Sequence, residues 1–192
     1  ESVQETVLDK PGIYGPEEGT ETIKGNLIIK SEDITLQNTV ISGDLIIAEE
    51  VGDGDVTLKN VTVQGNAIVR GGGSESINLE DSNLASLTVS KEGVRIVASG
   101  HTRVTVTTLE SGAILVSVVE TDAGGFETVT ISKEIPAEAK IILDGNFAEV
   151  NVKGTVAEIE IASGNVKELN IEAPVKVTGE GTILNANRAS LE

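Results

Sequence analysis

Three segments of this sequence decide its fold: ITLQNTVISGDLIIA (34–48), VTLKNVTVQGNAIVR (56–70) and INLEDSNLASLTVSK (77–91). They align without gaps at offsets of 22 and 21 residues. Their runs of Val, Ile, Leu and Thr are too short and too evenly spaced for helices, and Gly, Asn and Asp separate them. A period near 20 residues predicts a solenoid of stacked strands, in which each turn is stabilised by its neighbours.

The same apolar spacing continues on both sides of these segments. Upstream, IKGNLIIK (23–30) matches ISGDLIIA (41–48), and downstream FETVTI, FAEVNV, VAEIEI and VKELNI begin at residues 126, 147, 156 and 166. One aliphatic column through the chain would contain Ile28, Ile46, Ile68, Val89, Val106, Ile131, Val152 and Ile171. We therefore predict an all-β, single-stranded, right-handed parallel β-helix of about eight turns, roughly 40 Å long at ~4.8 Å per turn.

Polar and small residues mark the predicted turns. Asn38, Asn60 and Asp81 fall in one column, and stacked side-chain amides can hydrogen-bond from one turn to the next. A second column holds small residues, which favour a sharp bend between short strands. Its members are Gly25, Gly43, Gly65 and Ser86.

The composition requires an almost wholly aliphatic core. Cys, Met and Trp are absent, and Tyr14, Phe126 and Phe147 are the only aromatic residues. Val, Ile, Leu and Ala suit the thin layers of a parallel sheet better than a large globular interior. At 192 residues the chain fits one domain.

The formal charge of −17 excludes some classes of partner. Nucleic acid and acidic membrane surfaces would be repelled at long range, whereas cations and neutral polymers would not. No apolar run reaches the ~18 residues of a membrane-spanning helix, so we expect no membrane insertion. The absence of cysteine neither requires nor excludes an oxidising compartment.

The first 20 residues break the repeat. They contain DKPGIYGPEEGT (9–20), in which Pro11 and Pro16 interrupt the strand pattern. Because an uncovered end turn would offer unpaired strand edges, we expect residues 1–20 to form an N-terminal cap over the first turn, with Tyr14 as an anchor. Residues 21–190 then form the β-helix, within one domain overall.

An acidic segment is the candidate metal site. Glu49, Glu50, Asp53 and Asp55 lie within seven residues and would supply enough oxygen atoms for structural Ca²⁺ if the segment folds back on itself. The spacing departs from the EF-hand loop. A solvated turn at Asp53 and Gly54 is the alternative.

The sequence shows no catalytic machinery, and we expect a protein that is not an enzyme. His101 is the only histidine, so a catalytic triad or zinc site would depend on it alone, and we expect a turn or core role for it. Basic residues could lie near Glu80 and Asp81, but surface charges on consecutive turns cluster in this way by chance. These basic residues are Arg70, Lys91, Arg95 and Arg103.

Two further patterns concern the outer surface. The strands around Leu27 to Ile29, Leu45 to Ile47 and Ala67 to Val69 are apolar on both faces, so either parity could form the core. The outer column must be covered by the N-terminal segment, which we favour, or remain a strip that binds a partner. Threonines in TRVTVTT (102–108) and ETVTI (127–131) suggest ice binding, but their rows do not repeat across turns in the sequence.

The stretches YGPEEGTETIKGNLII (14–29) and ITLQNTVISGDLIIAEEVGDGDVTLKNVTVQG (34–65) resemble β-helical domains of surface-anchored proteins from spore-forming Gram-positive bacteria. The resemblance covers roughly residues 9–172. Such domains occur beside S-layer homology modules and glycan hydrolases, and one group of them is similar to carbohydrate-binding module family 54, found in large modular laminarinases. The resemblance implies a secreted or cell-surface module that binds insoluble xylan, β-1,3-glucan or chitin, with structural calcium a further implication.

The leading hypothesis is therefore a non-catalytic, monomeric polysaccharide-binding module, linked in cis to catalytic or S-layer homology modules. With few aromatic residues to stack on sugars, binding would depend on hydrogen bonds along a shallow face, and would be weak for single sugars and stronger for polymers. The predicted sugar-binding residues are Tyr14, Arg70, Glu80, Arg95 and Arg103. A passive spacer domain is the alternative, and a reduced polysaccharide lyase is a third, disfavoured by the short chain.

Overall fold

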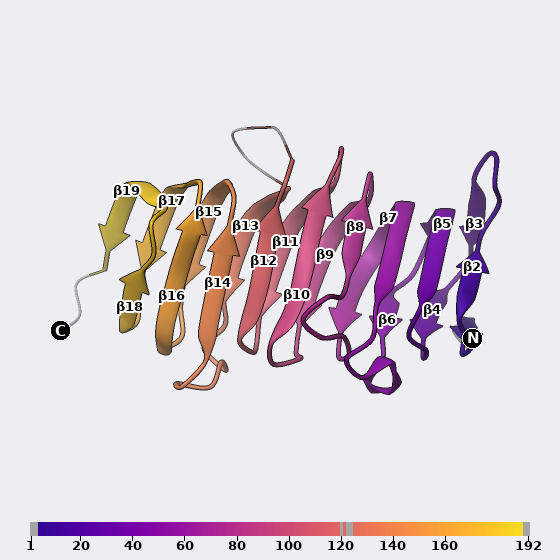
Figure 1. Ribbon diagram of the computed structural model, residues 1–192, viewed down its shortest axis with the longest axis horizontal. Helices are drawn as coiled ribbons and strands as arrows, with labels where there is room; N and C mark the ends of the chain where they lie inside the picture. The colour runs from indigo at the N-terminus through magenta and orange to yellow at the C-terminus, as the bar shows by residue number, and fades with distance from the viewer. Residues whose placement is uncertain (1–3, 120, 122–124, 190–192) are drawn as a thin grey trace.

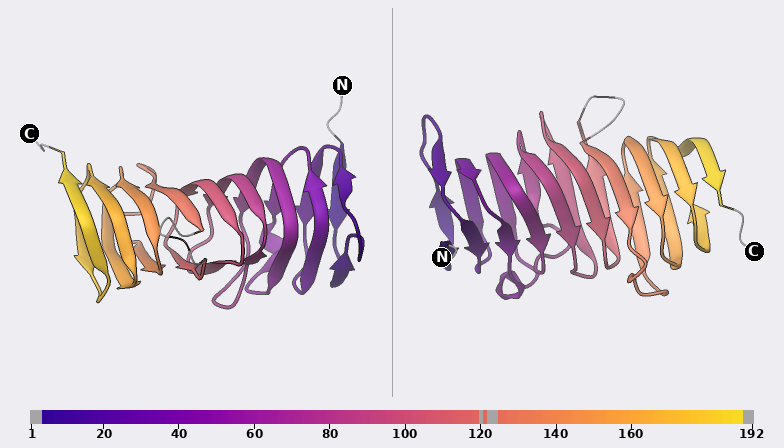
Figure 2. Two further views of the ribbon diagram at one scale, coloured as in Figure 1. Left: turned by 90° about the horizontal axis from the view of Figure 1, so that it is seen from above. Right: turned by 180° about the vertical axis from the view of Figure 1, so that it is seen from behind.

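The computed structural model describes residues 4–119, 121 and 125–189, and it shows a right-handed parallel β-helix of about nine turns (Figure 1). The strands stack side by side, and the first and last strands of the described chain lie at opposite ends of the stack (Figures 1 and 2). Every strand pairing in the described part of the chain is parallel, and the strands form three ladders. The predicted fold class is confirmed.

The first ladder is the longest, with successive strands 17 to 22 residues apart. It contains β1 (Glu5–Leu8), β4 (Asn26–Ile29), β6 (Leu45–Ile47), the end of β7 (Val56–Val69), β9 (Asn83–Val89), β11 (Arg103–Leu109), β13 (Phe126–Ile131), β15 (Phe147–Val152), β17 (Asn165–Ile171) and β19 (Thr182–Arg188). At ~4.8 Å per turn, the ten strands span roughly 43 Å.

The second and third ladders close each turn. The second contains β2 (Gly12–Tyr14), the start of β5 (Ile34–Ile41), the start of β7, β8 (Asn78–Glu80), β10 (Val94–Ser99), β12 (Ala113–Ser117), β14 (Lys140–Asp144), β16 (Val156–Ser163) and β18 (Val175–Thr178). The third begins with β3 (Glu21–Ile23), continues through the end of β5 and the middle of β7, and ends on the first residues of the later strands of the first ladder.

Aliphatic side chains from all three ladders fill the interior, as predicted. In the first ladder, Leu27 and Ile29 are fully buried, and the residues paired with them in the next turn, Leu45 and Ile47, are buried as well. In the third ladder, Phe126 and Phe147 stack with ring centroids 5.7 Å apart. Because alternate residues of a strand point to opposite faces, the residue between two buried ones points outward.

The predicted aliphatic column is right in its first three and last three members and breaks in the middle. Ile131, Val152 and Ile171 pair in register, but Leu109, not Val106, pairs with Val89 and Ile131. Ile28, Ile46 and Ile68 pair in register, but they are half-buried and face outward. Ile68 then pairs with Thr88, whereas Val89 pairs with Val69 on the buried side. The predicted column therefore crosses from the outer to the inner side at this turn.

The cause of this crossing is a change of register within β7 and β9. The pairing changes by one residue between Val63 and Asn66, because β9 is one residue shorter at that bend. Ser86 consequently pairs with Asn66 rather than joining the glycine column. The three glycines of that column do stack: Gly43 donates from its backbone N–H to the carbonyl of Gly25, and Gly65 donates to that of Gly43.

The predicted turn ladder is confirmed at its first step. Asn60 Nδ2 donates to Asn38 Oδ1 over 2.9 Å, and Asn38 donates onward to the carbonyl of Pro16. Asn38, Asn60 and Asp81 have φ angles of 50°, 53° and 48°, a left-handed conformation that Asn and Asp tolerate better than most residues. The polar side chains therefore suit both the backbone shape and the stacking.

The N-terminal segment lies on the first repeat turn, but as strands rather than as a separate lid. Its β1 pairs with β4 and its β2 pairs with β5, both in parallel register. Tyr14 is half-buried, and its hydroxyl donates to the carbonyl of Lys10 over 2.7 Å. Because the segment pairs edge to edge, it leaves the outer column uncovered, and Val7 joins that column at 45% exposure. The expected cover over the outer column is therefore wrong.

Replacing Thr107 by valine is expected to raise the free energy of unfolding by about 1 to 2 kcal/mol. Thr107 points into the core at 0% exposure, and its hydroxyl makes no hydrogen bond with any residue that the structure describes. Valine has the same shape without the buried polar group. Urea unfolding of the two proteins measures the difference.

Thr39→Val is the matched control for this substitution. Thr39 is equally buried at 1% exposure, but its hydroxyl donates to the carbonyl of Gln37 over 2.7 Å. Loss of this hydrogen bond is expected to lower the free energy of unfolding by about 1 kcal/mol. Equal effects of the two substitutions would contradict the assignment of an unpaired hydroxyl at Thr107.

Candidate functional site

The outer face of the first ladder carries one continuous column of outward side chains, one from each turn. The column changes in chemical character along the helix. It begins with aliphatic residues, continues with threonines and ends with asparagines. In order, its members are Val7, Ile28, Ile46, Ile68, Thr88, Thr108, Thr130, Asn151, Asn170 and Asn187.

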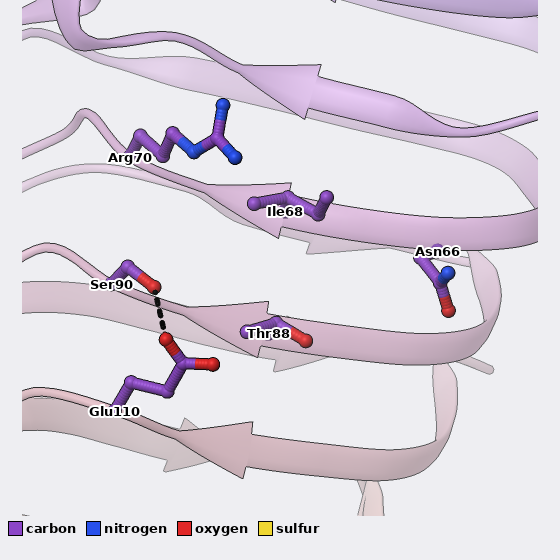
Figure 3. A pocket seen from close by; sticks show the side chains of 6 residues that line it. All are labelled: Asn66, Ile68, Arg70, Thr88, Ser90 and Glu110. Atoms are coloured by element: carbon purple, nitrogen blue, oxygen red, sulfur yellow. Dashed lines mark hydrogen bonds between the residues drawn. The ribbon is translucent and has the colours of Figure 1, made fainter. Parts of the chain in front are cut away.

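A shallow hollow of about 280 Å³ lies on this face where the aliphatic part meets the threonine part (Figure 3). It is lined by Asn66, Ile68, Arg70, Thr88, Ser90 and Glu110. These residues come from three successive turns, at the ends of β7, β9 and β11. The hollow therefore exists only because the ladder brings together residues about 20 positions apart.

Hydrogen-bonding groups surround a single apolar side chain in this hollow. Ser90 Oγ donates to Glu110 Oε2 over 3.0 Å, which orients that carboxylate (Figure 3). The side chains of Arg70 and Asn66 make no hydrogen bond or ion pair with the part of the chain that the structure describes. Their donor groups are free for a ligand, and Ile68 offers an apolar surface between them. The lining thus combines donors, acceptors and one aliphatic contact.

The asparagine end of the column is already satisfied internally. Asn170 Nδ2 donates to Asn151 Oδ1 over 2.8 Å, and Asn187 Nδ2 donates to Asn170 Oδ1 over 2.9 Å. Asn187 also donates to Glu168, and Asn170 is 3.4 Å from Glu149. These amides hold one another in place, so the last turns offer fewer free donors than the hollow does.

The structure brings only Arg70 of the five predicted sugar-binding residues into this hollow. Glu80 pairs with Lys59 over 3.7 Å, and Arg103 pairs with Glu127 over 2.8 Å. Tyr14 and Arg95 lie in the second ladder, in turns far apart along the chain. The five residues therefore do not form one surface.

The four carboxylates of the predicted calcium site are also not brought together. Glu49 and Glu50 are exposed in a short 3₁₀ helix, η1 (Glu49–Val51), and Asp53 lies 3.7 Å from the amino group of Lys91. Within residues 4–119, 121 and 125–189, no group of three or more His, Cys, Asp or Glu could hold a metal ion. Calcium takes six to eight oxygen ligands, so this arrangement does not fit it.

His101 lies in a turn, which is one of the two roles expected for it. Its side chain is 93% exposed, with Nδ1 3.6 Å from Asp81 Oδ1. Its backbone N–H donates to the same carboxylate oxygen over 2.8 Å. Asp81 thereby connects two successive turns, which is a structural role.

A cluster of three charged residues lies in the second ladder, away from the hollow. Lys140 Nζ is 3.3 Å from a carboxylate oxygen of both Glu158 and Glu160. The hydrogen bonds with Glu160 and then Glu158 raise the pKa of Lys140. The hydrogen bond from Thr178 is the largest cause that lowers the pKa of Glu158, and Lys140 lowers it further. The two ion pairs link the neighbouring strands β14 and β16.

Sequence reasoning did not find five of the six residues that line the hollow. The signal was present in the outward positions of Asn66, Ile68 and Arg70, which alternate with buried residues in the quoted repeat. Their neighbours Thr88 and Ser90 could be added only with the correct register, which the gap-free alignment misses by one residue.

The geometry defines the chain as a parallel β-helix with a long outer face that carries a hydrogen-bonding hollow. Comparison with protein-family models, curated proteins and solved structures finds no match. The only helical element in the described part of the chain is three residues long, so no helix there could cross a membrane.

Proposed function

We propose that this chain is a non-catalytic module that binds insoluble polysaccharide through the outer face of the first ladder. The observation that carries the proposal is the hollow between Asn66 and Glu110, where free donors and acceptors surround Ile68. Sugars present hydroxyl groups beside apolar C–H surfaces, and such a lining matches both. Xylan, β-1,3-glucan and chitin are the proposed polymers.

The charge of the chain supports a neutral ligand. A net charge of −17 opposes polyanions at long range but does not affect neutral glycans. A shallow face gives weak contacts to one sugar, and repeated contacts along a polymer raise the overall affinity. In a bacterial surface or secreted protein, such a module would hold a linked glycan hydrolase or S-layer homology module near its substrate.

Arg70→Ala is expected to lower the affinity for the bound polymer roughly tenfold, because a hydrogen bond from a charged donor contributes about 1.5 to 3 kcal/mol. The experiment incubates the pure protein with insoluble xylan, β-1,3-glucan, chitin and cellulose, and measures its depletion from solution. The wild type should be depleted by at least one polymer.

Arg95→Ala is the matched control, because Arg95 is also an outward arginine in a central turn but lies in the second ladder. It should bind as the wild type does. Equal losses for the two variants would contradict the assignment of the binding face to the first ladder.

A passive spacer is the second candidate, and the uninterrupted ladder favours it. Ten stacked strands with hydrogen bonds along the axis make a stiff rod whose stability does not depend on its surface residues. If none of the four polymers depletes the wild type, the polysaccharide proposal fails and the spacer function is favoured.

A further inference from the structure

We infer that one neutral polysaccharide chain lies parallel to the helix axis along the first seven residues of the outer column, rather than across it. This inference rests on the proposed function and adds the orientation and the length of the binding surface. We name these seven residues the axial strip: Val7, Ile28, Ile46, Ile68, Thr88, Thr108 and Thr130.

The register of the first ladder makes the axial strip continuous from turn to turn. Each member pairs directly with the next, so their spacing follows the ~4.8 Å separation of the strands, and six steps span roughly 29 Å. The hollow lies at Ile68 and Thr88, in the middle of this length. An extended polymer that leaves the hollow along the axis therefore meets further members of the axial strip.

The chemistry of the axial strip fits a neutral polymer with both apolar and hydroxyl surfaces. None of its seven members is charged, in a chain with a net charge of −17. Phe126 and Phe147 are buried and Tyr14 lies in another ladder, so isoleucines are the side chains available to pack against the C–H faces of sugars. The threonine hydroxyls can donate and accept hydrogen bonds with sugar hydroxyls.

The axial strip ends where the column residues become asparagines that are hydrogen-bonded to one another. In the two turns beyond Thr130, the outward positions beside the column are occupied by Glu149 and Glu168, which pair with each other in register. The column residues there, Asn151 and Asn170, already hydrogen-bond to each other. The polymer contact is therefore expected to stop near β13.

The test places a charge in the axial strip outside the hollow on either side: Ile28 lies two turns before Ile68, and Thr130 lies one turn beyond the turn of Glu110. Ile28→Lys and Thr130→Lys leave all six lining residues of the hollow unchanged. Each should lower the affinity for the insoluble polymer that retains the wild type by roughly threefold to tenfold, because part of a multivalent contact is lost. Ile28→Asn is a second variant that this column should accommodate, since it carries asparagine at positions 151 and 170.

Ile142→Lys is the matched control. Ile142 is a half-buried isoleucine that points outward from β14 in the second ladder, where it pairs with Ile114. It should bind as the wild type does, and circular dichroism should show the same strand content for all variants.

The possible outcomes separate the two proposals. Loss of binding in Ile28→Lys, Ile28→Asn and Thr130→Lys, with Ile142→Lys unaffected, supports the axial orientation. If these variants bind as the wild type while Arg70→Ala loses affinity, the hollow binds polysaccharide but the axial strip does not, and only this inference is overturned. If the wild type binds no polymer, the proposed function and this inference both fail.

Discussion

Replacing Phe147 by alanine is expected to lower the free energy of unfolding by about 3 to 5 kcal/mol. Phe147 is fully buried and stacks on Phe126, with 15° between the ring planes. Alanine would leave a cavity that the rigid turns on either side can fill only in part, and it would also remove the ring pair. Urea unfolding followed by circular dichroism measures the loss.

The effect of Phe147→Ala should also be local. Because each turn of a solenoid contacts only its neighbours, amide exchange should increase more in β15 and β17 than in β5 and β7. Phe147→Leu, which refills much of the space, should cost less than half as much. A loss below about 1 kcal/mol for Phe147→Ala would contradict the tight packing around this ring.

Replacing Gly164 by alanine is expected to cost about 2 to 4 kcal/mol, the second-largest effect. Gly164 has a φ of 74°, a conformation that costs alanine about 1 to 2 kcal/mol by itself. A β-carbon at this position would also overlap the backbone carbonyl of Gly145 in the preceding turn. Since backbone cannot rotate away as a side chain can, the two turns would have to separate.

Gly93→Ala isolates the contribution of that overlap. Gly93 has nearly the same φ, 77°, but a β-carbon there would meet no atom within 4 Å. Its substitution should therefore cost only the backbone strain, about 1 to 2 kcal/mol. Thermal unfolding of both variants gives the comparison, and equal losses would show that the turns are not in close contact at Gly164.

The fold could be predicted from the sequence because the first two quoted repeats keep both length and chemistry. The pairs Ile34 with Val56 and Leu36 with Leu58 lie in the register that the alignment gives. Asn38 and Asn60 occupy the turn that their residue type favours, and their side chains are hydrogen-bonded. Local preference and stacking agree at these positions, which makes the prediction secure.

The inner and outer sides of the first ladder could not be assigned in the same way. Leu27, Ile28 and Ile29 are all aliphatic, so hydrophobicity alone does not show which of them point outward. The structure buries Leu27 and Ile29 and leaves Ile28 half-buried. A later turn, with Thr88 between Leu87 and Val89, shows the alternation clearly, but only after its register is known.

The candidate site was missed because a one-residue change of register moves each side chain to the other face. The gap-free alignment pairs Ile68 with Val89, whereas the structure pairs it with Thr88. With that pairing, Thr88 and Ser90 join Ile68 and Arg70 on one surface. No composition or motif in the sequence indicates where a bend is one residue shorter.

The first and last described strands lie at opposite ends of the stack, and this gives the molecule a particular response to pulling. A force applied between opposite ends of the stack acts along the hydrogen bonds of the ladders, so it peels turns away one after another (Figure 2). Each released turn of about 20 residues would lengthen the chain by roughly 65 Å. Under tension the protein would therefore yield in many small steps and absorb the load gradually, instead of breaking in one event.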